Sequence, residues 1–432
     1  MTEFRIECYQ NEFLPRHGQV MNAVVTVTGT GTGSAGAMAM ATDTERSELF
    51  IVDASGSMSG KKLRAAKQAT SAAIDCVPDG VRFGVIAGNH RAALMFPGYR
   101  GGRPDLAVSS PQNRTSAKTV VKGLSAGGGT AMGAWITLAA ETFGDAPGIR
   151  HAILLTDGKN ETESPDELDA ALLAVEGAFQ CDCRGVGADW AVAELRKVAT
   201  ALMGTYDIVA KPEGLEDDFS SMMRAALSKR VSVGLRIWTP KLADVVLLKQ
   251  MEPQLDLTST RVDVDPLVGE YATGSWGDES RDYFLSVQVP AKEVDEEMLA
   301  ARITLVVGGQ PGEQGLVKAI WTDDVAKSTQ MNRRVAQAMN EEELADVIQE
   351  VVDSFRAGDL DSATNRAGRA VRMAHEAGNE DVLERLSKMF EVDDRATGRV
   401  RPRRNVDDVD VMIIETKSTR TSRTAKPAPE DP

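Results

Sequence analysis

The spacing of hydrophobic residues changes twice along this chain of 432 residues and divides it into three parts. In the first part, from residue 46 to residue 230, short apolar runs alternate with segments in which apolar residues recur every three or four positions. The runs predict strands and the recurring positions predict helices. Strands that alternate with helices form a mostly parallel, doubly wound α/β sheet. The expected strands cover residues 49–52, 81–86, 91–95, 152–155, 180–186 and 206–209, and the expected helices cover 59–77, 165–175, 190–203 and 216–230.

In the second part, apolar and polar residues alternate in short runs, as at residues 231–237, 283–289 and 303–307. This period of two predicts strands that bury one face, and short strands separated by turns indicate an antiparallel β-sandwich over residues 231–324. Residues 4–9 and 24–28 show the same pattern. We therefore expect residues 1–30 to pair with the later sandwich, so that the α/β part is inserted between them. Residues 31–45, rich in Gly, Ala and Thr, are the expected linker.

In the third part, helical spacing returns between residues 325 and 394. Three helices are expected around 344–355, 362–377 and 381–390, and their apolar faces predict a small bundle that packs on itself or on the sandwich. Residues 395–432 are mostly polar and charged, and 416–424 contain no apolar residue. A segment of that composition cannot bury a core, so we expect a disordered tail.

Charge and composition narrow the classes of function. A net charge of −15 argues against general binding to nucleic acid or to anionic membranes. No apolar run approaches the roughly 20 residues of a membrane span, and the first 19 residues lack the core of a signal peptide. Among only four cysteines, Cys181 and Cys183 fall on one face of an expected strand and should be buried thiols. These features predict a cytoplasmic protein.

Three short polar motifs stand where expected strands end. Asp53, Ser55 and Ser57 follow the run 49–52 in the pattern D-x-S-x-S. Thr130 follows three glycines, and Asp157 follows the strand at 152–155. Ligands of doubly wound sheets bind beside the carboxyl ends of the strands. Carboxylates and hydroxyls are hard oxygen donors of the kind that Mg²⁺ prefers, so the motifs predict a metal site.

Together the three motifs resemble the metal-ion-dependent adhesion site of von Willebrand factor A (VWA) domains, in a bacterial cytoplasmic type of protein. The order of the parts loosely resembles VWA proteins of the calcium-activated chloride-channel and inter-alpha-trypsin-inhibitor types. The resemblance implies a bound Mg²⁺, with Mn²⁺ and Ca²⁺ as alternatives, and a partner protein whose Asp or Glu completes the coordination. It also implies that Ser55, Ser57 and Thr130 bind the metal directly. Asp53 and Asp157 would supply charge, acting on the metal directly or through water. Asn160 and Glu161 are candidates to orient water around the ion.

Enzymatic interpretations find no support in the motifs. A P-loop requires G-x-x-x-x-G-K-[ST], but in residues 56–62 the glycines are one residue too close and Lys62 replaces the hydroxyl. The four histidines are scattered without a zinc-binding pair. His90 and His151 lie beside expected strands, where a role at the strand edge is favoured over an approach to the metal. No nucleophile, base and orienting group come together, so we predict that the chain is not an enzyme.

The predicted function is metal-dependent protein binding in an intracellular signalling or stress-response assembly. An alternative is a VWA subunit of a motor or chelatase-type complex that presents substrate to an ATPase. The chain has no ATPase motif, so the ATPase would be a separate protein. The tail adds a further hypothesis, since its hydroxyls alternate with cations and phosphorylation there would create a ligand for a phosphothreonine reader. The partners would be a Ser/Thr kinase, a phosphatase or a forkhead-associated-domain protein. The candidate phosphorylation sites are Thr416, Thr419, Thr421 and Thr424.

Overall fold

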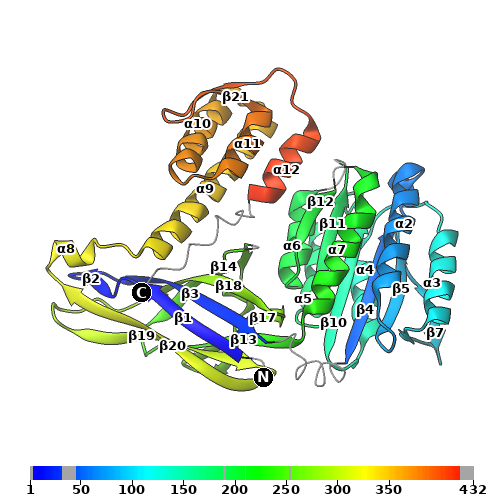
Figure 1. Ribbon diagram of the computed structural model, residues 1–432, viewed down its shortest axis with the longest axis horizontal. Coiled ribbons are helices and arrows are strands. Elements are labelled where there is room, and N and C mark those ends of the chain that lie inside the picture. Colours follow the sequence, from blue (N-terminus) through cyan, green and yellow to red (C-terminus); the bar gives the residue numbers. More distant parts are fainter. Residues whose placement is uncertain (1–2, 32–44, 188–190, 210, 253, 419–432) are drawn as a thin grey trace. The chain divides into compact units, whose positions relative to one another are not determined.

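The computed structural model describes residues 3–31, 45–187, 191–209, 211–252 and 254–418 (Figure 1). The chain divides into two compact units. The first contains residues 29–233 and 273–279. The second contains residues 4–28, residues 234–272 and the chain from residue 280 onward.

The first unit is built on a sheet of mostly parallel strands. Its order is β12-β11-β10-β4-β5-β6, with the short strand β9 also paired to β5. The parallel members are β4 (Arg46–Asp53), β5 (Arg82–Gly88), β10 (Ile149–Thr156), β11 (Gln180–Val186) and β12 (Tyr206–Val209). The antiparallel members are β6 (Ala92–Phe96) and β9 (Ala107–Val108). A separate hairpin joins β7 (Tyr99–Arg100) to β8 (Arg103–Pro104).

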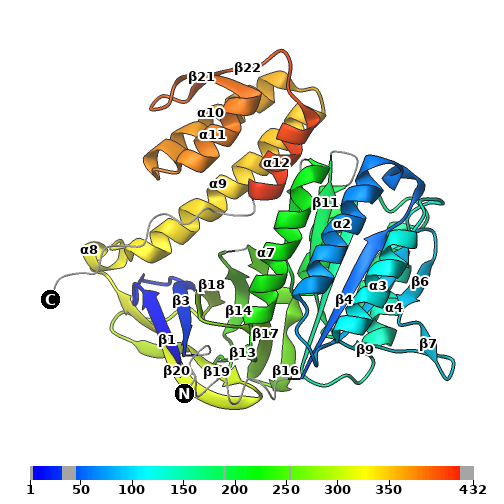
Figure 2. The same cartoon turned by 45° about the vertical axis from the view of Figure 1, so that its right-hand side comes forward.

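Helices cover both faces of this sheet (Figures 1 and 2). One face packs against α2 (Lys61–Cys76), α3 (Pro111–Gly123) and α7 (Leu215–Ser228). Side chains of alternate strand positions, such as Phe50 and Ile153, meet these helices in one apolar core. The other helices of the unit are α4 (Met132–Phe143), α5 (Pro165–Ala174) and α6 (Val192–Ala201), with short 3-10 turns η1 (Gly56–Met58) and η2 (Pro212–Gly214). The doubly wound α/β prediction is confirmed.

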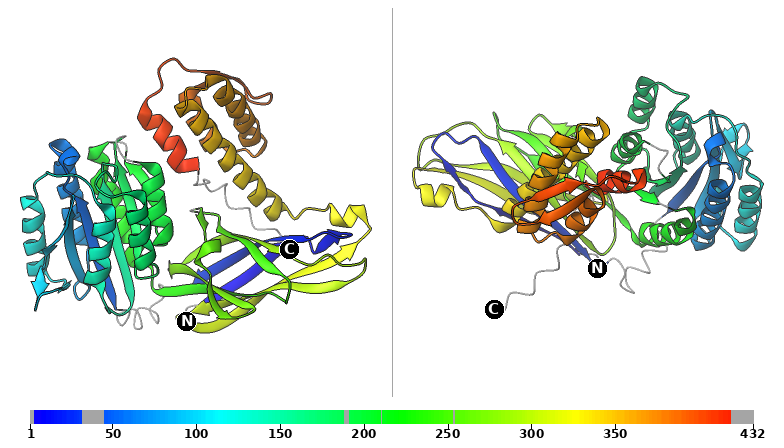
Figure 3. Two further views of the ribbon diagram at one scale, coloured as in Figure 1. Left: turned by 180° about the vertical axis from the view of Figure 1, so that it is seen from behind. Right: turned by 90° about the horizontal axis from the view of Figure 1, so that it is seen from above.

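Strands that precede and follow the α/β segment in the sequence form two largely antiparallel sheets. One has the order β1-β3-β18-β14-β15 and the other β16-β17-β13-β19-β20-β2. The first sheet contains β1 (Glu3–Gln10), β3 (Val20–Thr30), β14 (Asp244–Gln250), β15 (Leu255–Asp256) and β18 (Glu279–Gln288). The second contains β2 (Phe13–Pro15), β13 (Val231–Trp238), β16 (Val262–Asp265), β17 (Val268–Trp276), β19 (Glu297–Val307) and β20 (Gln310–Thr322), with a further 3-10 turn η3 (Thr258–Thr260) between β15 and β16. Strands from before residue 31 therefore pair with strands from after residue 230 (Figure 3, left).

Helices follow the sandwich. They are α8 (Val325–Ser328), α9 (Arg333–Arg356), α10 (Leu360–Glu376), α11 (Glu380–Met389) and α12 (Asp408–Ser418). The first half of α9 packs on the first sheet, where Val335 contacts the cluster that contains Val24 and Phe284. The second half of α9 packs with α10, α11 and α12 around a separate apolar core. One long helix thus joins the sandwich to the bundle.

The prediction of a disordered tail from residue 395 is wrong for residues 395–418. A hairpin joins β21 (Phe390–Asp394) to β22 (Arg399–Pro402), and α12 follows it. Val400, Val411 and Ile414 enter the bundle core, which supplies the apolar burial that the local composition conceals. Arg385 donates to the carbonyl of Lys417 over 2.8 Å and so satisfies one end of α12.

The same packing overturns one candidate phosphorylation site. Thr416 has no exposed surface. A kinase could reach its hydroxyl only after α12 separated from the bundle. Thr419, Thr421 and Thr424 lie outside the described residues. In the described part of the chain, no helix is long and apolar enough to cross a membrane.

Candidate metal centre

The candidate metal residues lie at one edge of the α/β sheet. Because β4 and β10 are neighbouring parallel strands, with Val52 opposite Leu155, their carboxyl ends coincide. Asp53 is the last residue of β4, and Asp157 directly follows β10. Parallel pairing alone therefore places two carboxylates side by side at the edge where such sheets bind ligands.

Short hydrogen bonds join these carboxylates to the two serines of the motif. The backbone N–H of Ser55 donates to Oδ1 of Asp53 over 2.7 Å. Oγ of Ser55 lies 2.9 Å from Oγ of Ser57, which donates to Oδ1 of Asp157 over 2.7 Å. The hydroxyl of Thr156 donates to the other oxygen of Asp53 over 2.5 Å. Asp53, Ser55, Ser57 and Asp157 thus form one connected cluster of oxygen atoms.

Thr130 reaches the same cluster through a loop of glycines. The backbone N–H of Gly56 donates to the carbonyl of Gly128 over 2.8 Å, which fastens this loop to the D-x-S-x-S turn. Gly158 adjoins both hydroxyls, since a β-carbon at this position would lie 3.4 Å from Oγ of Ser57 and 3.4 Å from Oγ1 of Thr130. Glycine therefore leaves the space between these hydroxyls open. All five residues that the motifs indicate are brought together.

The charges of the cluster fit a cation. Asp53 is completely buried. Burial raises the pKa of its carboxyl, while hydrogen bonds from Thr156 and Ser55 oppose the rise. Among the described residues no cationic side chain forms an ion pair with Asp53, whereas Nζ of Lys62 lies 2.6 Å from Oδ2 of Asp157. Two carboxylates and three hydroxyls with only one ammonium group are a donor set suited to a hard divalent ion.

Comparisons with known proteins identify the family of the chain. The von Willebrand factor type A domain profile matches residues 49–208, and the von Willebrand factor type A C-terminal domain profile matches residues 372–418. A solved structure described as a von Willebrand factor type A protein from Catenulispora acidiphila is 42% identical, covers 98% of both chains and has a TM-score of 0.90. The chain belongs to the von Willebrand factor type A family.

Two curated relatives match a smaller region. An uncharacterized protein of Synechocystis is 26% identical over 210 residues, which are 48% of this chain and 45% of that protein. Human inter-alpha-trypsin inhibitor heavy chain H4 is 27% identical over 165 residues, 36% of this chain and 17% of that protein. The match therefore spans less than half the length of either relative.

Asn160 has a structural role beside the candidate site of this VWA domain. It is buried, and its Oδ1 accepts a hydrogen bond of 3.0 Å from the backbone N–H of Met132. The backbone N–H of Asn160 donates to the carboxylate of Glu194 over 3.0 Å. Asn160 therefore caps the first turn of α4 and positions the loop that carries Thr130, so its side-chain oxygen is already engaged. Glu161 lies exposed on the same loop.

Sequence reasoning missed two residues that shape the VWA site. Glu163 accepts hydrogen bonds from the backbone N–H groups of Gly133 and Ala134, over 2.8 and 2.9 Å, and so holds the start of α4. Lys62 pairs with Asp157. A signal for Lys62 was present, because a cation in the first turn of a helix opposes the helix dipole and needs an acidic partner. The first turn of α2 contains no acidic residue to serve as one.

The two histidines considered near the site have separate positions. His90 is exposed beside the glycine loop, since a β-carbon on Gly128 would lie 2.2 Å from its Nδ1. His151 is buried near the start of β10, six residues before Asp157 and so about 20 Å from it along the strand. His151 does not contribute to the metal cluster.

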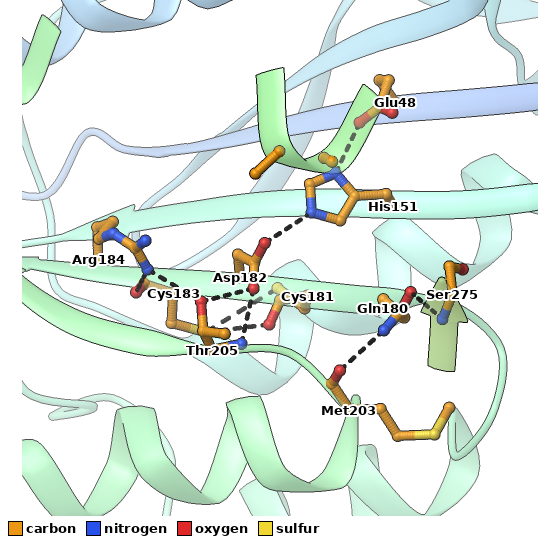
Figure 4. Close-up of polar contacts among 12 residues, drawn as sticks. Glu48, His151, Gln180, Cys181, Asp182, Cys183, Arg184, Met203, Thr205 and Ser275 are labelled. Atoms are coloured by element: carbon orange, nitrogen blue, oxygen red, sulfur yellow. Dashed lines mark hydrogen bonds and ion pairs between the residues drawn. The ribbon is translucent and has the colours of Figure 1, made fainter. Parts of the chain in front are cut away.

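His151 instead joins a second buried polar cluster (Figure 4). Its Nδ1 lies 2.7 Å from Glu48 and its Nε2 lies 3.0 Å from Asp182. The outer oxygens of these carboxylates are also engaged, Glu48 by Arg46 over 2.6 Å and Asp182 by the backbone and hydroxyl of Thr205. Three adjacent strands are thereby tied together through buried charges.

The thiols in Figure 4 agree with the sequence-based prediction. Cys181 and Cys183 are buried and free, and their sulfur atoms lie 4.0 Å apart on β11.

Proposed function

We propose that this protein is a metal-dependent protein-binding module. Hydroxyls of the D-x-S-x-S turn and the glycine loop would hold a divalent cation, with the two carboxylates supplying negative charge. The residues are Ser55, Ser57, Thr130, Asp53 and Asp157. Mg²⁺ is the preferred ion, with Mn²⁺ and Ca²⁺ as alternatives.

One observation carries the proposal: Asp53 is fully buried and accepts hydrogen bonds from two neighbours, yet no cation pairs with it in the described part of the chain. A buried carboxylate without a counter-charge is costly, and a bound cation removes that cost. The surrounding donors are all oxygen atoms, which suit a hard ion such as Mg²⁺. When bound, the ion would supply a directional electrophilic contact for an acidic ligand.

The ligand that best fits the loaded site is a carboxylate of a partner protein. Because the hydroxyls that would contact the ion are neutral, carboxylates do not fill its coordination shell, and an anionic ligand gains from contacting it directly. Ser57 is exposed, so one side of the cluster opens to solvent. An Asp or Glu side chain on a partner surface would satisfy both the charge and the octahedral geometry that Mg²⁺ requires.

The proposed setting is an intracellular signalling or stress-response assembly. Hydroxyl and cationic residues alternate after residue 418, and phosphorylation of Thr419, Thr421 or Thr424 would create a ligand for a phosphothreonine reader. A Ser/Thr kinase, a phosphatase or a forkhead-associated-domain protein is the class of partner that this chemistry suits.

Affinity purification tests the proposal directly. Full-length protein is immobilised in Mg²⁺, exposed to lysate of the native host, and eluted with EDTA, with the Asp53→Ala protein as a matched control. Partners should elute with EDTA from the unaltered protein and be absent from the control. Isothermal titration with Mg²⁺ and Mn²⁺ measures the ion itself. Unchanged metal affinity in the Asp53→Ala protein would rule the assignment out.

A further inference from the structure

The ion pair between Lys62 and Asp157 lies inside the proposed metal site. Nζ of Lys62 is 2.6 Å from Oδ2 of Asp157, whose other oxygen accepts the hydrogen bond from Ser57. The side chain of Asp157 is completely buried and that of Lys62 is 25% exposed. An ammonium group therefore already serves one of the two carboxylates that a metal ion would use.

The fold directs Lys62 to this position. It is the second residue of α2, where the positive end of the helix dipole disfavours a cation. Its stem lies over the carboxyl end of β11, since a β-carbon on Gly187 would lie 3.9 Å from its Cε. Lys61 stands beside it in the same helical turn but is exposed. The attraction of Asp157 thus offsets an unfavourable helix position for Lys62 alone.

We propose that Lys62 is a built-in counter-cation that lowers the metal affinity of the site, an inference that rests on the proposed function. In the metal-free protein the ammonium neutralises Asp157, so the site does not carry two unpaired buried carboxylates. A divalent ion must share Asp157 with this ammonium group and is repelled by it.

The same charge would favour an acidic ligand. With a divalent ion bound, Asp53 and Asp157 cancel the charge of the ion and Lys62 contributes one further positive charge. One carboxylate of a partner would make the site neutral. Lys62 would therefore weaken binding of the metal and strengthen the attraction of the loaded site for the partner. Binding of the metal and binding of the partner would be coupled.

Calorimetric titration with Mn²⁺ alone tests the inference without any partner. Lys62→Met keeps the stem of the side chain and removes the charge, so Mn²⁺ should bind about tenfold more tightly, as expected for the loss of a nearby charge in a partly exposed site. Lys61→Met removes the same charge from the same turn and should bind as the unaltered protein does. Lys62→Arg restores the cation and should bring the affinity back toward that of the unaltered protein.

A second readout covers the metal-free state. Without metal, Lys62→Met should melt at a lower temperature than Lys61→Met. Mn²⁺ should raise its melting temperature by more, because a ligand that binds the folded state more tightly stabilises it more. Lys62→Gln, which keeps a donor for Asp157, is measured in parallel so that the result does not depend on the folding of one variant.

The outcomes separate this inference from the function on which it rests. Mn²⁺ binding that is absent from the unaltered protein and from every Lys62 variant would overturn the proposed function itself. Mn²⁺ binding by the unaltered protein with equal affinity in the Lys61→Met and Lys62→Met proteins would overturn the role of Lys62 alone. Mn²⁺ binding detectable only after Lys62→Met would support Lys62 as the competing cation.

Discussion

Nδ1 of His151 lies 2.7 Å from Oε2 of Glu48, and both side chains are buried in the interior of the α/β unit. A buried imidazole usually stays neutral. Here burial lowers the pKa of His151, but the charge of Glu48 and hydrogen bonds to Asp182 and Glu48 outweigh it and raise this pKa to about 9. The pKa of Asp182 is lowered, chiefly by the hydrogen bond and charge of His151 acting against burial. The cluster is therefore a charged, hydrogen-bonded network that links three strands.

This charged network predicts that the stability of the protein depends on pH. The folded-state pKa of His151, about 9, lies above its ordinary value of 6.5, so the stabilisation is fully present below pH 6.5 and is lost as the pH rises toward 9. The free energy of unfolding should fall across that window by up to about 3 kcal/mol. Denaturant unfolding at several pH values measures it. His375→Gln, at an exposed histidine, should keep this dependence of the unfolding free energy on pH, and His151→Gln should lose it.

Asp53→Asn should abolish metal binding without unfolding the protein. The substitution removes a charge from a fully buried group whose pKa burial already raises, so the metal-free protein should melt at the same temperature or higher. Mn²⁺ titration and thermal melting are measured on the same sample. A lower melting temperature together with retained Mn²⁺ binding would contradict the assignment of Asp53 to the metal site.

Gly158→Ala should weaken metal binding through space rather than charge. The added methyl group would lie 3.4 Å from the hydroxyl oxygens of Ser57 and Thr130, which is an ordinary contact and should leave the fold intact. It would nevertheless occupy the gap that these two oxygens share. We expect Mn²⁺ affinity to fall at least tenfold, the equivalent of about 1.4 kcal/mol. Gly123→Ala, at a position with no atom within reach of the new methyl, is the matched control.

The sequence was sufficient to predict that the motif residues lie together, because each motif adjoins a regular element. Asp53 and Asp157 could be placed together because parallel strands share their carboxyl ends. A local signal also marks the start of α5, where Ser164 and Glu167 form the reciprocal hydrogen bonds of a capping box. Long-range partners could not, because the pairing of Lys62 with Asp157, 95 positions apart, depends on the tertiary fold.

The helices α3 and α12 show the limits of local patterns. Helix α3 contributes only Ala117 and Val121 as buried residues, too few for a clear periodic signal, although Ser110 and Pro111 mark its start. Helix α12 follows a charged segment and buries Val411 and Ile414 against other helices. Its order comes from tertiary packing, which composition does not reveal.

The N-terminal strand β3 should be essential for folding of the sandwich. Val25 in this strand is completely buried, whereas Val20 in the same strand is 45% exposed. Val25→Asp places a charge in the core and should cost about 3 kcal/mol or more, with aggregation on expression. Val20→Asp should change the stability by less than about 0.5 kcal/mol. Equal solubility and equal melting temperatures of the two variants would show that β3 contributes little to the core.

Helix α12 should likewise be an integral part of the bundle rather than a tail. Ile414 is 2% exposed and packs in the bundle core, while its neighbour Ile413 is only partly buried. Ile414→Asp should destabilise the bundle by about 3 kcal/mol or more, because an unpaired carboxylate would replace a core side chain. Ile413→Asp introduces the same charge one position away and should cost clearly less.

Proteolysis followed by mass spectrometry provides the measurement. In the Ile414→Asp protein, cleavage should appear between residues 395 and 418 at protease concentrations that leave the unaltered chain intact there. Rapid cleavage of this segment in the unaltered protein would instead restore the original expectation of a disordered tail.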